Sequence, residues 1–220
     1  MWPDLFGALI QPRQALFINI NLNSADPYPA ATCPRMLAEL DHFLSDHGHR
    51  RIEAGERSGY DALPTRRVAK KTGFLDALAG RARFLDFDST DWVRVDLPEP
   101  YLYSATVPKA VLAADRIISL ANLKTHRLAD YSFGLKLAVG YLHPLERHAL
   151  HQDHLQEKAV EINLAVAADL TLIDGRKAFV SEFVGWVATS GSYPTVWQPS
   201  QCAPPRRIVR ECHAHPDLVC

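Results

Sequence analysis

Residues 15–56 read ALFININLNSADPYPAATCPRMLAELDHFLSDHGHRRIEAGE, and this stretch decides the fold. The apolar, β-branched run at 15–22 predicts a buried strand followed by a turn-rich loop. Pro34 near a first helical turn, with apolar residues at helical spacing, predicts an amphipathic helix as far as Gly48. Residues 50–56 predict the next strand. This β–α–β order is typical of a parallel sheet covered by helices.

The rest of the chain continues this alternation of strands and helices. We expect a helix over 65–80 with a break at Gly73, a strand and a hairpin insertion over 82–107, a short helix from Pro108, a strand over 115–123, helices over 132–142 and 150–168, and a strand over 169–175. The predicted fold class is therefore α/β, with a mostly parallel sheet, helices on both faces, Rossmann-like layering and a single domain over residues 1–180.

The composition of the chain indicates which kinds of molecule the protein binds. The chain has 220 residues, and its 24 Lys and Arg balance 25 acidic residues, so it has no basic field that would attract nucleic acid or anionic lipid. The N-terminus has no Lys or Arg before Arg13, unlike a secretion signal, and no apolar run reaches 18 residues. We expect a cytoplasmic protein that binds a small molecule, and neither nucleic acid nor a membrane.

The spacing of the cysteines and histidines indicates which metal cofactors the chain could hold. The four cysteines form no C-x-x-C pair, so the chain carries no iron–sulfur motif of its own. His148, His151 and His154 are spaced by three residues, which places neighbours about 60° apart on a helix and lets two of them share a divalent metal. The alternative for these histidines is a solvated helix start.

Polar residues directly after the predicted strands are the candidates for a site, because parallel sheets bind ligands at the carboxyl ends of their strands. Lys124 and His126 stand two apart on an extended segment, so they project to one side and can grip an anion or transfer a proton. A solvated loop is the alternative. Asp174 can accept a proton, hold a metal or form a turn with Gly175. The same collection of strand-end residues includes Asn21, Asn23 and Glu56.

The segment from Val107 to Leu142 resembles the signature of the family called domain of unknown function 362. The matching residues are Ala114-Asp115, Lys124-Thr125-His126, Gly134, Lys136 and Gly140, followed further on by His151 and Asp174-Gly175. The resemblance covers roughly residues 15–180 and implies that Lys124 and His126 belong to a real site. Some relatives carry iron–sulfur segments that this chain lacks.

Two departures from the family pattern stand out. The family usually has Lys-Pro-Asn after the first strand, whereas this chain has Asn19-Ile20-Asn21, so that Asn21 is carried over and a basic contact is missing. Residues 181–220 form an atypical tail with Pro, Arg and three of the four cysteines. We hypothesise that this tail is out of frame, disordered or otherwise a truncated end.

The sequence thus favours a protein that binds a small anionic metabolite at the carboxyl ends of the strands. The expected catalytic residues are Lys124, His126 and Asp174, the expected ligand-binding residues are Asn21, Thr125, Gly134 and Lys136, and the expected metal ligand is His151. Two alternatives remain open at this point: a non-catalytic module associated with metal or redox proteins, and an inactive truncated family member.

Overall fold

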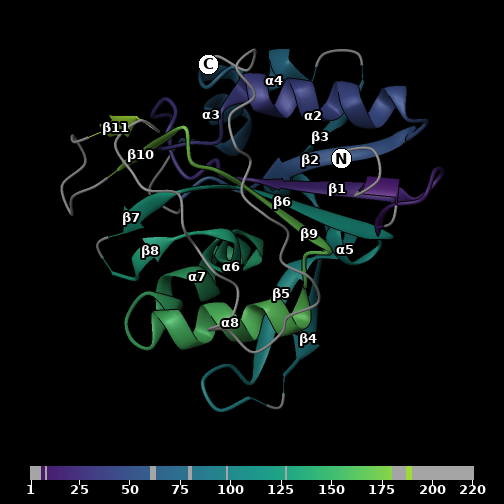
Figure 1. The fold of residues 1–220 in the computed structure, drawn as a ribbon. Helices are drawn as coiled ribbons and strands as arrows, with labels where there is room; N and C mark the ends of the chain where they lie inside the picture. The colour runs from purple at the N-terminus through teal and green to yellow at the C-terminus, as the bar shows by residue number, and fades with distance from the viewer. Residues whose placement is uncertain are drawn as a thin grey trace.

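A five-stranded parallel sheet with the order β3-β2-β1-β6-β9 forms the centre of the molecule (Figure 1). The computed structural model describes residues 6–7, 9–59, 63–78, 81–97, 99–126, 128–179 and 187–189. The strands of the sheet are β1 (Ala15–Ile20), β2 (Arg51–Glu56), β3 (Arg83–Asp86), β6 (Arg116–Asn122) and β9 (Leu170–Asp174). The predicted α/β class is confirmed.

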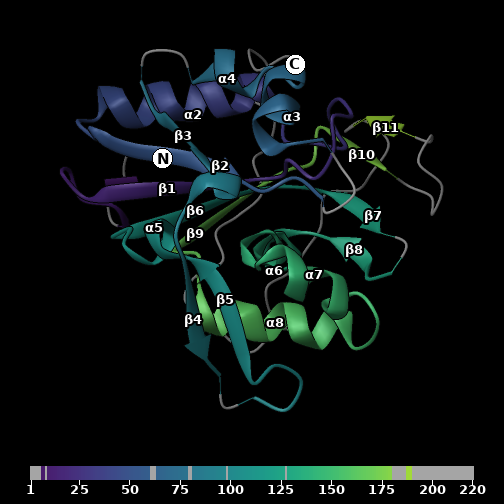
Figure 2. The same cartoon turned by 180° about the vertical axis from the view of Figure 1, so that it is seen from behind.

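Helices cover both faces of this sheet, as Figures 1 and 2 show from opposite sides. One face carries α2 (Pro34–Asp46), α3 (Thr65–Lys71) and α4 (Phe74–Ala77). The other carries α6 (Gly134–Leu137), a 3-10 turn at Ala138–Tyr141, α7 (Pro144–Leu150) and α8 (Leu155–Ala165). Smaller elements complete the fold: the 3-10 turn Phe87–Ser89, β4 (Trp92–Asp96), β5 (Ser104–Pro108), α5 (Lys109–Leu112), β7 (Lys124–His126), β8 (Asp130–Ser132), β10 (Lys177–Phe179) and β11 (Val187–Thr189).

The continuous apolar run of β1 follows from its burial on both faces. Ile18 and Ile20 pack in the core beneath α2, where Leu37 is also buried. Phe17 points to the opposite core, and its ring lies 6.2 Å from that of Tyr141. Full burial of one large aliphatic or aromatic side chain contributes about 1.5–3 kcal/mol. Two cores that share one central strand explain why this strand tolerates so few polar residues.

The expected helix over 65–80 and hairpin over 82–107 are confirmed in outline. Gly73, with φ of +82°, separates α3 from α4, because only glycine adopts this left-handed conformation readily. The strand β3 pairs parallel with β2, and β4 pairs antiparallel with β5, as expected for a hairpin insertion.

The helices predicted over 132–142 and 150–168 are wrong in their bounds. The first ends as a helix at Leu137 and tightens into the 3-10 turn. Pro144 then starts an unexpected helix, since proline lacks an N–H and suits a first helical turn. As a result His148 lies in α7, His151 ends it and His154 precedes α8 with φ of +47°, so the three histidines do not share one helix.

The tail that we expected to be atypical lies outside the described residues, apart from β11, which pairs antiparallel with β10. The domain boundary at residue 180 and the idea of an out-of-frame end therefore stay predictions. Within the described part of the chain, no helix has the length and apolar character needed to cross a membrane.

Candidate functional site

The strand order places a switch point between β1 and β6. From β1 the chain adds β2 and β3 on one side, and then β6 and β9 on the other. Ligands of open α/β sheets bind at the carboxyl ends of the strands beside such a point. The small hairpin of β7 and β8 lies at this end of the sheet, together with β10 (Figure 1). Buried polar and charged side chains gather here.

Glu56, the last residue of β2, is the acidic group at this end. Its side chain is buried, and its carboxylate accepts a hydrogen bond from the backbone N–H of Leu22, just after β1. The carboxylate also lies against Gly140 in the 3-10 turn, where any Cβ would overlap it. Gly140 therefore permits the close approach of the turn to β2. This contact explains why a glycine is needed at position 140, one of the positions that resemble the family signature.

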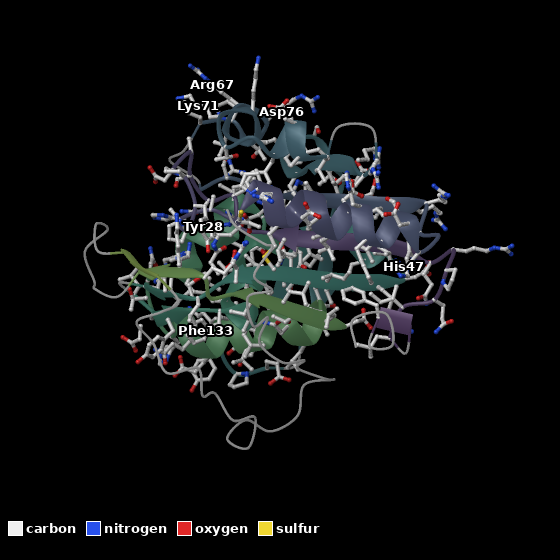
Figure 3. All side chains as sticks on the ribbon, turned by 45° about the horizontal axis from the view of Figure 1, so that its top comes forward. Tyr28, His47, Arg67, Lys71, Asp76 and Phe133 are labelled. Atoms are coloured by element: carbon white, nitrogen blue, oxygen red, sulfur yellow. The ribbon has the colours of Figure 1, made fainter. Side chains whose placement is uncertain are left out.

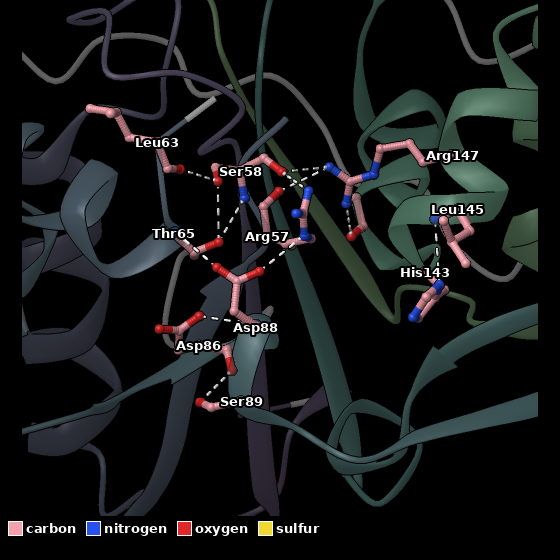
Figure 4. A network of polar contacts seen from close by, with 11 residues as sticks. Arg57, Ser58, Leu63, Thr65, Asp86, Asp88, Ser89, His143, Leu145 and Arg147 are labelled. Carbon is pink, nitrogen blue, oxygen red and sulfur yellow. Dashed lines mark hydrogen bonds and ion pairs between the residues drawn. The ribbon is translucent and has the colours of Figure 1, made fainter. Parts of the chain in front are cut away.

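Arg147 of α7 supplies a buried guanidinium whose charge attracts this carboxylate. It donates hydrogen bonds to the carbonyl oxygens of Arg57 at 2.9 Å, Ser58 at 3.3 Å and Gly140 at 2.5 Å. Figure 4 shows how the segment that receives these bonds is held in turn: the Arg57 guanidinium pairs with Asp88 at 3.0 Å. The network fixes the backbone that follows Glu56.

Lys124 and Lys136 complete a group of four interacting charges with Glu56 and Arg147. Burial raises the pKa of Glu56 to about 7, with Arg147 as the main opposing charge. Burial lowers the pKa of Lys124 to about 8 against the attraction of Glu56. Burial, reinforced by the charge of Lys124, lowers the pKa of Lys136 to about 8 as well. Three groups that titrate near neutral pH in one place are typical of functional sites.

The two lysines differ in their partners. The Lys124 ammonium donates a hydrogen bond to the carbonyl oxygen of Ala30 at 2.6 Å, from the loop that follows β1. The Lys136 ammonium has no hydrogen bond or ion pair with any residue that the structure describes, although its side chain is largely buried. Among the described residues, the carboxylate of Glu56 attracts the Lys136 ammonium electrostatically but does not form an ion pair with it.

Asp174 lies at the same end of the sheet, but its carboxylate is already engaged. Arg176 binds it through two hydrogen bonds of 3.0 and 2.6 Å, and the Tyr28 hydroxyl donates to it at 3.0 Å. Tyr28, labelled in Figure 3, also accepts a hydrogen bond from the Lys177 backbone N–H. These contacts tie the loop after β1 to the end of β9. A catalytic role for Asp174 remains untested.

His126 ends β7, and Thr125 precedes it. The Nδ1 atom of His126 accepts hydrogen bonds from the backbone N–H groups of Leu128 and Ala129, both at 3.2 Å. This ring nitrogen therefore helps to shape the β7–β8 turn. The hairpin pairs Thr125 with Tyr131, so the Lys-Thr-His segment is extended, as the sequence predicted, but it forms a separate short strand paired with β8.

Asn21 and Gly134 have local structural roles. The backbone N–H of Asn21 donates a hydrogen bond to the Thr32 hydroxyl, and the Asn21 carbonyl oxygen accepts one from the Thr32 backbone N–H. The buried side-chain oxygen of Asn21 has no hydrogen-bond partner among the described residues. A Cβ on Gly134 would collide with Thr171 of β9, so packing accounts for this glycine. The helix that Gly134 begins has four residues, too few for its dipole to attract an anion to its start.

The sequence predicted His151 as a metal ligand, and a metal site would need further ligands beside it. No group of three or more His, Cys, Asp or Glu side chains suited to a metal ion occurs in the described ranges. His151 Nδ1 lies 2.7 Å from the Arg147 carbonyl oxygen, and burial lowers the pKa of His151. A metal at His151 remains a prediction.

Arg147 is the site residue that sequence reasoning missed, and Glu56 is the one whose importance it underrated. The available signal for Arg147 was its spacing of three from Leu150, which is buried on the same side of α7. A long cation on the apolar side of a helix indicates a buried partner.

Comparison with known proteins supports the fold and the family. A search of curated proteins finds no match. The chain is similar to a Thermotoga maritima protein whose crystal structure came from the Northeast Structural Genomics Consortium, with 15% identity and a TM-score of 0.51 over 80% of this chain. The chain spans about half the length of that structure, 49%. The family model for the domain of unknown function DUF362 matches residues 16–187, and the protein therefore belongs to this family.

Proposed function

We propose that the carboxyl end of the sheet binds a small anionic metabolite between Lys124 and Lys136. The proposal is supported by the balance of charge: three basic groups, the two lysines and Arg147, surround one carboxylate, Glu56. A carboxylate or phosphate would bring this cluster closer to neutrality. At about 4 Å and an effective dielectric constant of about 20, each new ion pair is worth roughly 4 kcal/mol before desolvation costs.

The observation that carries the proposal is the Lys136 ammonium, which is largely buried and donates no hydrogen bond to any described residue. Keeping such a cation in the folded state costs stability unless an anion offsets it. Binding of an anion would favour the protonated lysines and raise the pKa of both above about 8.

We further propose that Glu56 exchanges a proton with the bound molecule. A carboxyl group with a pKa of about 7 is suited to act as a general base near neutral pH. His126, at the end of the neighbouring hairpin, is the second candidate for this role. The proposed reaction class is therefore proton transfer to or from an anionic substrate, and Asn21 would complete the wall of the pocket.

A thermal-shift series tests binding. The unfolding temperature of the whole chain would be measured with phosphate, malate and citrate, for the wild type, Lys124→Met, Lys136→Met and the control Lys71→Met. Lys71 is exposed on α3 and points away from the sheet in Figure 3. A ligand at 100 times its Kd adds about 2.7 kcal/mol, which for this size is roughly 5–10 °C.

We expect one of the anions to stabilise the wild type and Lys71→Met equally, and to lose at least tenfold in affinity with either site variant. The proposal fails if none of the three anions shifts the wild type, or if Lys71→Met weakens binding as much as Lys136→Met does. Glu56→Gln and His126→Gln, run beside them, separate the two candidates for proton transfer. The variant of the correct residue loses the part of the pH dependence of binding that lies near pH 7, whereas the part near pH 8 that the two lysines cause persists.

A further inference from the structure

A second hollow lies at the opposite end of the sheet, where the strands begin. It consists of two adjoining cavities of about 430 Å³ each, which share Arg50, Ile52 and Arg81. The first reaches the end of α2, and the second runs along the starts of β1, β2 and β3 to the α5 segment. Figure 3 labels His47 near this end and Tyr28 at the end that holds the proposed anion site.

Four guanidinium groups line this amino-end hollow, and two carboxylates oppose them. Arg83 pairs with Glu53, and Arg81 makes a long contact of 3.5 Å with Asp46. The other two lining arginines are Arg50 and Arg51. In the described part of the chain, neither of their side chains forms an ion pair or a hydrogen bond. The hollow thus carries an excess of positive charge that the neighbouring acidic groups leave uncompensated.

The wall of the first cavity contains a buried histidine, His49, whose side chain is 4% exposed. Its Nδ1 atom has no hydrogen-bond partner among the described residues, and burial lowers the pKa of the ring. A neutral imidazole offers one donor and one acceptor. Since buried polar atoms normally have partners, this nitrogen is an exception among the described residues, and the neutral ring adds no negative charge to the wall.

The second cavity adds an apolar side to the hollow. Ala110, Ala113 and Ala114 line it beside the starts of β1 and β2. These small side chains leave room for the body of an organic molecule, while the guanidinium groups face its charged end. Arginine is suited to phosphate because its planar fork donates two parallel hydrogen bonds.

We propose that this amino-end hollow binds a small organic phosphate, with the phosphate group between Arg50 and Arg81 and the organic part against the three alanines. The site is separate from the proposed anion site, because the two lie at opposite ends of the same strands. An ester therefore binds more tightly than inorganic phosphate, since only the ester has a group to bury against the alanines.

Titration by NMR of the full chain with phenyl phosphate, and in parallel with inorganic phosphate, tests this inference. We expect saturable shifts of the backbone amides of residues 49–52 and 81–83, with phenyl phosphate binding at least threefold more tightly. The double variant Arg50→Gln/Arg81→Gln is expected to weaken phenyl phosphate at least tenfold. Arg50→Lys keeps the charge but loses the fork, and is expected to have an intermediate effect.

Two controls make the result decisive. Arg94→Gln removes an arginine of β4 that is 68% exposed and does not line the hollow, and Lys136→Met disables the carboxyl-end site. Neither is expected to change the affinity by more than twofold. The inference is overturned by unsaturable binding to the wild type, by equal weakening in Arg94→Gln, or by loss of these shifts in Lys136→Met. Urea unfolding of each variant confirms that it is folded.

Discussion

Replacement of Arg147 by methionine tests whether the buried guanidinium holds the candidate site together. Methionine keeps much of the side-chain volume and its packing within the core, but it has no charge and no hydrogen-bond donor. The change leaves the carbonyl oxygens of Arg57, Ser58 and Gly140 without their donor. It also removes the main positive charge that opposes protonation of Glu56.

The magnitude follows from the three lost contacts. A hydrogen bond to a charged group contributes about 1.5–3 kcal/mol, and these three are not additive because they share one guanidinium. Each buried carbonyl oxygen that is left without its donor costs about 1–3 kcal/mol. We therefore expect Arg147→Met to lower the free energy of unfolding by about 3–5 kcal/mol, a large part of the roughly 5–15 kcal/mol of a typical domain.

Urea denaturation followed by circular dichroism measures this loss at pH 7. The matched control is Arg94→Met, where an arginine that is 68% exposed makes a contact of 3.5 Å with Asp96, and a change within about 0.5 kcal/mol is expected. A loss below about 1 kcal/mol for Arg147→Met, with an unchanged m-value, would refute the reasoning. It would mean that water replaces the guanidinium without cost and that Arg147 does not organise the backbone after Glu56.

Three further changes probe neighbouring contacts. Gly140→Ala forces the Glu56 carboxylate away from the 3-10 turn, and we expect the free energy of unfolding in urea to fall by about 1–3 kcal/mol. Adding Glu56→Ala, which removes the overlapping carboxylate, is expected to restore part of this loss. Lys136→Met is expected to stabilise the protein at pH 7. The pKa of Lys136 is about 8 when folded against an ordinary 10.5, so the unfolded state binds more protons between these values. The gain is therefore greatest below about pH 8 and vanishes as the pH rises to about 10.5, which urea midpoints from pH 7 to 10 would check. Tyr28→Phe removes the hydroxyl that donates to Asp174, and a loss of about 1–2 kcal/mol is expected in the same assay; no loss would mean that Arg176 alone satisfies that carboxylate.

The fold was predictable because its strands and helices follow hydrophobic periodicity that local sequence contains. The stretch from Ala15 to Glu56 specifies a buried strand, an amphipathic helix and a second strand, and the structure places all three where expected. Prediction failed between Ser132 and Leu155, where the helix expected over 132–142 is a short helix followed by a 3-10 turn, and the helix α7 forms in a stretch where none was expected. The cause is tertiary: the turn packs against Glu56, a residue about 80 positions earlier in the chain, and no local pattern encodes this contact.

The candidate site was predictable only where the strand-end rule applies. That rule identified Lys124, and it included Glu56 among the residues that leave strands in the same direction. It had no means to find Arg147, which reaches the site from a helix, or to show that Asp174 is bound by Arg176. Long-range pairing of charges depends on how helices dock onto the sheet, and this geometry is absent from sequence spacing.

Buried charged residues with many hydrogen-bond partners in the protein have structural roles, and those with few such partners are the candidates for functional roles. Arg147 and Asp174 are buried, and each makes several hydrogen bonds to the protein, so their charges serve the fold. Lys136 is largely buried without such bonds in the described part of the chain, and Glu56 is held with a pKa near neutrality. Removing a group of the first kind leaves its hydrogen-bond partners unsatisfied, whereas a buried charge of the second kind costs stability while it has no partner. Selection for stability alone would replace Lys136 with an apolar residue such as methionine, and its presence is explained if binding of an anion offsets the cost.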